Sequence, residues 1–368
     1  MLQTQSLTGA DWQIGVTVNT SEVADGSPTL TPTLGEYPIY DATLYEVMAN
    51  DEERNWRFRE ALERFAKDRV VIDIGTGAEL VWAQEAARIG ASQVFAIEAM
   101  EASAHAASQR LQKMDYADRI SLIHAESTNL NLELRADVCV AEIIGSLAGA
   151  EGAAAVLSDA KKRLLKPGAI IIPHQCVSYA AAANLADLLQ MKTPAFSPMA
   201  CPYLKQIFDW AGEPFDVRLR VTNPATDGIL SESEIVERLD FNGDLLVEQE
   251  HRVALRINKA GTINGILTWL ALTCLPGQAP LNALLCESNW ASIFLPLFDE
   301  AVQVDVGDTL YLHVKTALSK DGIHPDYAVQ GELKTATGVT HGEHYSPYLG
   351  HSLQGNPIHK RLFPSLGW

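Results

Sequence analysis

Short apolar runs alternate with longer amphipathic segments between residues 70 and 173. Residues 80–89, for example, have the apolar spacing of a helix and lie between two such runs. Strands that alternate with helices in this way form a parallel α/β sheet. The expected strands of this sheet are residues 70–74, 93–97, 120–124, 136–142 and 169–172, with a Lys-Pro-Gly turn at 166–168 before the last one.

The pattern changes after Pro173. The following β-leaning segments are short and are separated by Gly, Pro, Asn and Asp, which predicts an antiparallel sandwich or barrel. These segments are residues 217–221, 251–257, 265–272, 301–304 and 309–315, and residues 185–210 interrupt them with helical spacing around a proline-containing centre.

The N-terminal pattern is weaker. Residues 1–34 are polar and rich in Thr, Ser and Gly, which predicts a tail with at most one short strand, and residues 37–65 look helical from about Ala42. We therefore expect a polar tail over 1–34, an α/β domain over 35–173 and a β-rich domain over 174–368.

A strand that runs into a glycine turn suggests a nucleoside site. The run Val-Val-Ile-Asp-Ile-Gly-Thr-Gly ends with Asp73, Gly75 and Gly77, and glycines there let a ligand approach the backbone closely. The next predicted strand ends at Glu98, roughly 20 residues after the turn, where an acid can hydrogen-bond both hydroxyls of a ribose.

This turn does not fit a dinucleotide. A dinucleotide fingerprint has a third glycine three residues after the second, where this chain has Leu80, and no Gly-Lys-Ser/Thr of a phosphate-binding loop follows. Asp73 would repel a pyrophosphate but suits a cationic ligand. S-adenosylmethionine (SAM) carries an ammonium and a sulfonium, so the turn favours SAM as the cofactor.

The composition limits the classes of binding partner and the expected cellular compartment. The 368 residues are 47% hydrophobic and 20% charged, with a formal net charge of −18, which argues against nucleic acid and anionic membrane as partners. Five scattered cysteines without a Cys-x-x-Cys motif indicate reduced thiols in a cytoplasmic protein, and no metal site is expected. The N-terminus lacks a signal-peptide pattern, and no apolar run is long enough for a transmembrane helix.

Two glutamates flank a small apolar loop after the fourth predicted strand. Glu142 and Glu151 converge if this loop is hairpin-like, and ligands bind at such strand ends. At roughly 4 Å and an effective dielectric of about 20, two like charges repel by about 4 kcal/mol, so the pair needs a cation or a proton. A guanidinium suits it because its planar fork matches carboxylates. Two solvated or helix-capping acids are the alternative.

These motifs together resemble the protein arginine methyltransferases, SAM-dependent enzymes, over about residues 36–310. The double-glutamate spacing, the Asp-x-Gly-x-Gly turn and the ribose acid all match that family in order. So do the helix motif from Tyr45 to Arg54, the short aromatic segment at Tyr37 and Tyr40, and the loop Ser288-Asn289-Trp290. The resemblance implies a Rossmann-like domain, a β-barrel and a helical dimerisation arm at about residues 185–210, and hence a homodimer.

The resemblance also implies roles for single residues. Arg54 would pair with the SAM carboxylate. Tyr45 is compatible with core packing or with substrate contact. The implied catalytic set is Glu142, Glu151, Tyr45, Asp51, Asn289 and Trp290, and the implied cofactor set is Tyr37, Tyr40, Arg54, Asp73, Gly75, Gly77, Glu98, Ala99, Glu126, Ser127 and Glu142.

Three departures from the family alter the expected chemistry. The third glycine of the family turn is Glu79, an aromatic of the glutamate loop is Ser146, and the family's histidine, which pairs with the acid matching Asp51, is Asn289. An asparagine cannot titrate, so a proton relay of that kind is missing.

Three functions remain open from the sequence. The first is methylation of a guanidino nitrogen, in a peptide arginine or a small guanidino metabolite. The second is N- or O-methylation of a small or carrier-bound natural-product intermediate. The third is an inactive SAM-binding regulatory protein, suggested by Glu79 and Asn289 and opposed by the intact Glu142 and Glu151.

Overall fold

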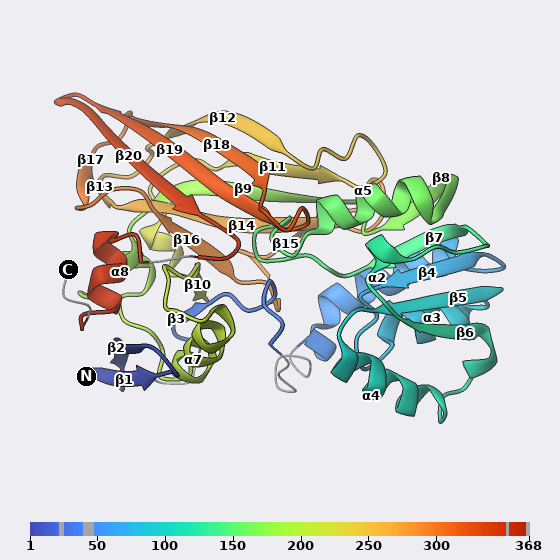
Figure 1. Cartoon of the computed structure of the whole chain (residues 1–368). Coiled ribbons are helices and arrows are strands. Elements are labelled where there is room, and N and C mark those ends of the chain that lie inside the picture. The colour runs from blue at the N-terminus through green and yellow to red at the C-terminus, as the bar shows by residue number, and fades with distance from the viewer. Residues whose placement is uncertain (22–25, 40–47, 287, 351–352, 366–368) are drawn as a thin grey trace.

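The computed structural model describes residues 1–21, 26–39, 48–286, 288–350 and 353–365. An α/β region and a region of antiparallel strands lie side by side, and the long strands β18, β19 and β20 extend away from the α/β region (Figure 1). Within the described ranges, no helix is long and apolar enough to cross a membrane.

The α/β region contains the expected five-stranded parallel sheet, in the order β6-β5-β4-β7-β8. The last strand begins at Leu165 rather than 169, and the predicted turn at 166–168 lies inside it, where the β7–β8 register shifts. The strands are β4 Val70–Ile74, β5 Gln93–Glu98, β6 Ile120–His124, β7 Ala136–Ala141 and β8 Leu165–Ile172.

Helices pack on this sheet through small side chains. Ala83, Ala86 and Ala87 of α3 are fully buried, which brings its backbone close to the central strands. The helices are α2 Glu52–Phe65, α3 Val81–Ile89, α4 Glu101–Leu111 and α5 Ala153–Arg163, with short 3-10 turns η1 Ala117–Arg119 and η2 Ser127–Asn129.

The second region consists of antiparallel sheets, and alternate residues of its main sheet pack into two separate hydrophobic clusters. The main sheet has the order β11-β9-β14-β16-β10-β3, with β15 beside β14, and a second sheet has the order β12-β18-β19-β20. The closed barrel implied by the resemblance is not confirmed, because the described strands pair as separate sheets. The elements are β3 Thr29–Pro32, β9 Gln175–Ala183, β10 Leu219–Thr222, β11 Glu234–Asp240, β12 Gln249–Arg256, β13 Gly261–Ile263, β14 Gly265–Thr273, β15 Leu281–Asn282, β16 Ser292–Pro296, β17 Val302–Val304, β18 Thr309–Leu318, β19 Pro325–Thr335, β20 Gly338–Ser346 and η3 Thr226–Gly228.

The N-terminal segment is not a tail. It forms the hairpin of β1 Leu2–Thr8 and β2 Gln13–Asn19, followed by β3 in the main sheet, so the prediction of at most one short strand is wrong. The physical reason is the alternation of Ile14, Val16 and Val18, which are fully buried on one face of β2.

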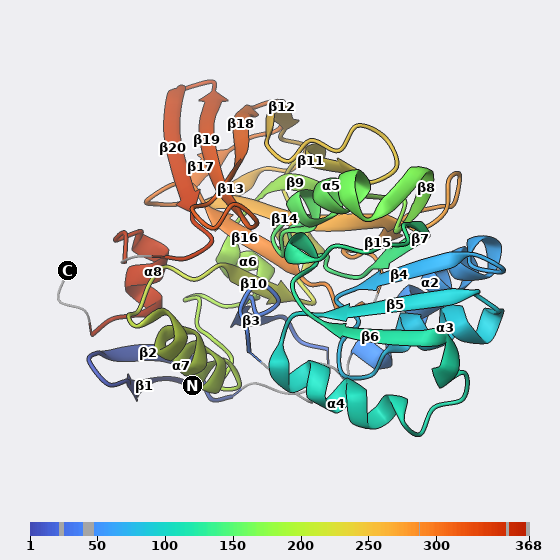
Figure 2. The same cartoon turned by 45° about the vertical axis from the view of Figure 1, so that its right-hand side comes forward.

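Residues 185–210 form the short α6 Leu185–Leu188 and most of α7 Ala200–Ala211. One face of α7 is buried with Leu204, Ile207 and Phe208 in a core that also takes side chains from β2 and from α8 Pro357–Leu362. Both views show α7 beside the N-terminal hairpin (Figures 1 and 2). The predicted arm is therefore covered by its own chain on one side.

Candidate functional site

The glycine turn lies at the carboxyl end of β4. Gly75 and Gly77 adopt φ values of +75° and +67°, in the region that favours glycine. The carbonyl of Ile97, on the neighbouring strand, accepts the N–H groups of Gly75 and Thr76, each at 3.0 Å. A Cβ at Gly75 would lie 2.9 Å from Cγ2 of Ile143, so the turn also packs closely on the loop after β7.

Asp73 stabilises this turn through hydrogen bonds. It is fully buried, and its Oδ2 accepts the Thr76 hydroxyl at 2.6 Å and the N–H of Ala83 at 3.0 Å. The second bond caps α3, which needs an acceptor because Leu80 precedes the helix in a left-handed conformation with no side-chain cap. Burial raises the pKa of Asp73 to about 7. Its Oδ1 has no hydrogen-bond partner in the described part of the chain.

Glu98 fixes the other side of the turn. One carboxylate oxygen accepts the N–H of Gly77 at 2.9 Å and the other accepts the N–H of Met100 at 2.8 Å. Each oxygen retains a second acceptor position, so the carboxylate can also take ribose hydroxyls. The adjoining Ala99 carbonyl is bonded to the His124 ring at 3.2 Å.

Glu126 and Ser127 follow β6 at the same edge of the sheet. Glu126 precedes η2 and accepts the side-chain amide of Asn129 at 3.1 Å. Ser127 is buried, and its carbonyl accepts Nη2 of Arg163 at 2.8 Å. The carboxyl ends of three neighbouring strands, β4, β5 and β6, thus carry the predicted cofactor residues at one edge.

An ion pair connects α2 to the end of β7. Arg54 Nη2 lies 2.7 Å from Glu142 Oε2, and both side chains are only 6% exposed. Arg54 Nη1 also donates to the Met48 carbonyl at 2.6 Å, and the guanidinium lies over the Trp82 ring at 5.5 Å. Arg54 Nε is buried without a partner among the described residues. The sequence interpretation gave Arg54 to the cofactor and missed its bond to Glu142.

Glu151 is the second acid of this site. Its pKa is raised to about 8, chiefly by desolvation and also by the charges of Glu142 and Glu36, while Arg54 acts against the shift. Burial raises the pKa of Glu142 too, with Arg54 acting against the shift. Glu151 also packs on the backbone of Gly35, because a Cβ there would overlap Oε1 of Glu151. The two acids are thus close enough for their charges to interact, and Arg54 is the arginine that opposes the pKa shift of both.

The β-rich region holds the loop between these acids. The N–H of Ala148 donates to the Ser178 hydroxyl at 3.0 Å, and the N–H of Gly149 donates to Oε2 of Glu237 at 3.3 Å. Ser178 and Tyr327 donate to Glu237 at 2.8 and 3.0 Å. A Cβ at Gly149 would lie 2.6 Å from Glu237 Oε1, so only glycine fits without movement.

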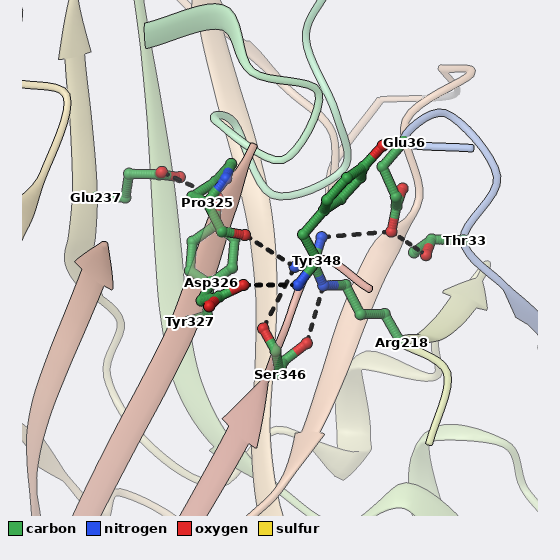
Figure 3. Close-up of polar contacts among 9 residues, drawn as sticks. All are labelled: Thr33, Glu36, Arg218, Glu237, Pro325, Asp326, Tyr327, Ser346 and Tyr348. Carbon is green, nitrogen blue, oxygen red and sulfur yellow. Dashed lines mark hydrogen bonds and ion pairs between the residues drawn. The ribbon is translucent and has the colours of Figure 1, made fainter. Parts of the chain in front are cut away.

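A second buried cluster surrounds Arg218 and includes Tyr327 (Figure 3). Arg218 is 4% exposed, lies over the Tyr327 ring at 5.1 Å and pairs with Glu36 at 3.3 Å. It also donates to the Ser346 hydroxyl at 2.8 Å, and the Thr33 hydroxyl donates to Glu36. Since Glu36 follows Gly35, this cluster anchors the segment on which Glu151 packs.

The loop 288–290 joins the two regions. Asp51 caps α2 by accepting the N–H of Arg54 at 3.0 Å, and its other oxygen accepts the backbone N–H of Asn289 at 2.9 Å. The Trp290 indole donates to the Ile144 carbonyl of the glutamate loop at 2.7 Å. Asn289 thus meets Asp51 through its backbone, and its Oδ1 is buried without a partner among the described residues.

Of the tyrosines that the resemblance assigned to the site, Tyr37 lies within the described residues. Tyr37 is 6% exposed and packs edge-on against Trp210 at 5.5 Å and near Phe215 at 6.2 Å, in the core beneath α7. This location gives Tyr37 a packing role. Tyr40 and Tyr45 lie outside the described residues. Glu79, at the third-glycine position, is on the surface and pairs with Arg110 at 2.5 Å.

The comparisons with known proteins agree with this geometry. The family model described as PRMT5 arginine-N-methyltransferase matches residues 35–172. Arginine N(omega)-methyltransferase of Streptomyces achromogenes subsp. streptozoticus is 30% identical over 288 residues, which are 73% of this chain and 74% of that protein. Protein arginine N-methyltransferase 7 of Drosophila grimshawi is 28% identical over 66% of this chain, and the match spans only 37% of that relative's length.

Solved structures support the same fold. A Trypanosoma brucei PRMT1 enzyme-prozyme heterotetrameric complex with AdoHcy matches with a TM-score of 0.66 and 18% identity, over 83% of this chain and 98% of that one. Arabidopsis thaliana protein arginine methyltransferase 10 gives a TM-score of 0.65 at 16% identity over the same shares. These structures show the fold, and the Streptomyces relative shows that the chain belongs to the arginine N-methyltransferase family of SAM-dependent methyltransferases.

Proposed function

We propose that this protein transfers a methyl group from SAM to a terminal nitrogen of an arginine guanidinium. The observation that carries the proposal is the pair of Glu142 and Glu151, two buried or partly buried acids that share the single charge of Arg54. A guanidinium between them would supply the missing positive charge and could form two parallel hydrogen bonds to a carboxylate. The relatives named as arginine methyltransferases support this assignment.

The cofactor edge has polar groups that suit SAM. Arg54 Nε is buried without a partner in the described residues and can donate to the carboxylate of the methionine part. Glu98 is held where it can accept ribose hydroxyls, and the glycines at 75 and 77 leave space beside the backbone. Bound there, SAM supplies an electrophilic methyl group on a sulfonium.

The acids orient and polarise the acceptor. Glu142 is held by Arg54 and Glu151 by its packing on Gly35, so both can align the guanidinium and concentrate its positive charge away from the attacking nitrogen. Glu151, with a pKa raised to about 8, is the better base for the proton that the methylated product must lose.

The assembly and location that we propose rest on separate observations. Met199, which directly precedes α7, and Trp210 of α7 are 70% and 41% exposed and lie three turns apart on one face, so this face suits a symmetric dimer contact. Five free cysteines, of which only Cys286 is exposed, suit a reducing cytoplasm. Met199→Glu with Trp210→Glu should dissociate such a dimer, and an unchanged sedimentation coefficient would contradict it.

The direct test of the reaction is labelled methyl transfer. The protein is incubated with methyl-labelled SAM and a panel of arginine-containing peptides, free arginine and neutral hydroxyl acceptors, and the products are analysed by mass spectrometry. Label on a guanidino nitrogen is expected. Label on oxygen, or binding of SAM without any transfer, would instead support the O-methylating or the inactive alternative, which no feature of the site favours.

A further inference from the structure

Arg220 of β10 is an unusual arginine. It is partly buried, and its Nη2 donates to the backbone carbonyl of Asn289 at 3.1 Å. Desolvation lowers its pKa, and within the described ranges no carboxylate forms an ion pair with it. The other arginines of the site are paired, Arg54 with Glu142 and Arg218 with Glu36. Since a buried charge is costly without a partner, the guanidinium of Arg220 is suited to an anionic ligand.

Two further polar groups lie beside Arg220 without partners of their own. Thr31 of β3 is its cross-strand neighbour on the same face of the antiparallel pair, and Oγ1 of Thr31 is buried with no hydrogen bond among the described residues. Oδ1 of Asn289 is also buried with no hydrogen bond among the described residues. The first can donate to an anion and the second can accept from a cation.

This group of three, which we call the Arg220 cluster, adjoins the acid site through one residue. The N–H of Asn289 bonds to Asp51, the cap of the helix that carries Arg54, while the carbonyl of Asn289 bonds to Arg220. One residue spans at most about 3.6 Å of chain, so the hydrogen bond to Arg220 and the hydrogen bond to Asp51 lie within one residue's length of each other.

We propose that the Arg220 cluster binds the α-amino and α-carboxylate groups of free arginine, so that the acceptor is the amino acid itself. Arg220 and Thr31 hold the carboxylate, Asn289 Oδ1 accepts from the ammonium, and the side chain reaches Glu142 and Glu151. This inference rests on the proposed guanidino methylation. An arginine within a peptide has neither terminal charge and would leave Arg220 uncompensated. The Streptomyces relative, which matches over most of its own length, is also named for arginine rather than for protein arginine.

The test measures ligand affinity, so it does not depend on turnover. Protein saturated with S-adenosylhomocysteine is titrated calorimetrically with L-arginine, with agmatine, which lacks the carboxylate, and with an arginine-containing peptide. L-arginine should bind about 10- to 100-fold more tightly than either competitor, because charge-assisted hydrogen bonds are lost with the carboxylate. In Arg220→Met this preference should fall close to unity, and Arg220→Lys should keep part of it.

Controls separate a binding role from a structural one. Arg252→Met, on the exposed outer face of β12, should keep the wild-type preference, and each variant should keep the wild-type affinity for SAM. Equal affinity for agmatine and L-arginine in the wild type would overturn the inference. So would an equal loss for all three ligands in Arg220→Met, because that result assigns Arg220 to holding the Asn289 loop. If arginine binds selectively but no methyl is transferred, the proposed function fails and the subsite stands.

Discussion

The cofactor edge and the glutamate loop lie at the same end of the parallel sheet, but their supports come from different places. Asp73 and Glu98 are held by residues of the α/β region itself, namely Thr76, Gly77 and Ala83. The glutamate loop is held from outside the α/β region, by Ser178, Glu237 and Trp290. Cofactor binding can therefore survive changes in the β-rich region that disable the acceptor site.

Replacing either glutamate should have the largest effect on the acceptor site. Glu142→Gln and Glu151→Gln keep the shape but remove a charge, and losing one partner of a buried charge pair costs about 3–5 kcal/mol. We expect kcat/KM for arginine to fall by roughly two to three orders of magnitude in both variants, with SAM affinity retained in Glu151→Gln, in steady-state kinetics combined with calorimetry. Glu142→Gln should be the worse of the two because it also strands Arg54. A full-rate Glu151→Gln would reject the guanidinium clamp.

Gly35→Ala changes the backbone on which Glu151 packs without replacing an ionisable residue. The added methyl would overlap Oε1 of Glu151, so the carboxylate must move. Small misplacements of reacting groups can cost about a hundredfold in rate, and we expect a tenfold to hundredfold loss of kcat/KM. The experiment is a parallel measurement of turnover and of SAM affinity, and equal losses in both would show that the two sites are not separable in this way.

Tyr327→Phe tests the longer-range support. It removes the hydroxyl that donates to Glu237, which in turn binds Gly149, and this should raise KM for arginine about tenfold while SAM affinity stays constant. Tyr345→Phe is the matched control, since its hydroxyl bonds to Asp326 on an exposed surface. If both variants behave alike, the glutamate loop does not depend on Glu237.

The smallest expected effect is the release of a fraction of a proton when arginine binds. The pKa of Glu151 is raised from 4.5 to about 8, so at pH 7 its carboxyl is mostly protonated until a cation binds. A bound guanidinium favours the charged form and lowers this pKa, so arginine binding should release a fraction of a proton between about pH 5 and 8. Calorimetry in buffers of different ionisation enthalpy measures this release. It should vanish in Glu151→Gln, and uptake instead of release would contradict the assigned charge state.

The same contrast explains what could be predicted from the sequence. The parallel strands, the turn at Gly75 and Gly77, and the convergence of Glu142 with Glu151 follow from local patterns. Their bounds are close to those in the structure. The supports from Glu237, Tyr327 and Arg218 had no local signal, because each partner is distant in the chain and unremarkable within its own strand.

The misinterpretation of the N-terminal segment has an identifiable cause. The polar composition of residues 1–34 concealed the apolar alternation of β2, where only every second side chain is buried. The polar residues 338–346 have no apolar run either, but they form β20, which pairs along its full length with β19. In both strands the hydrogen-bonded neighbour, and not the composition, determines the structure.

The most direct test of the account is a paired titration of wild-type protein and Glu151→Gln with SAM and then with L-arginine. Glu151 belongs to the acceptor site and contacts Gly35, whereas the cofactor edge is built by Asp73, Gly77 and Glu98. We predict an unchanged dissociation constant for SAM and at least about tenfold weaker arginine binding in the variant. Equal loss of both ligands, or full retention of arginine binding, would contradict a guanidinium held by paired glutamates beside an independent cofactor site.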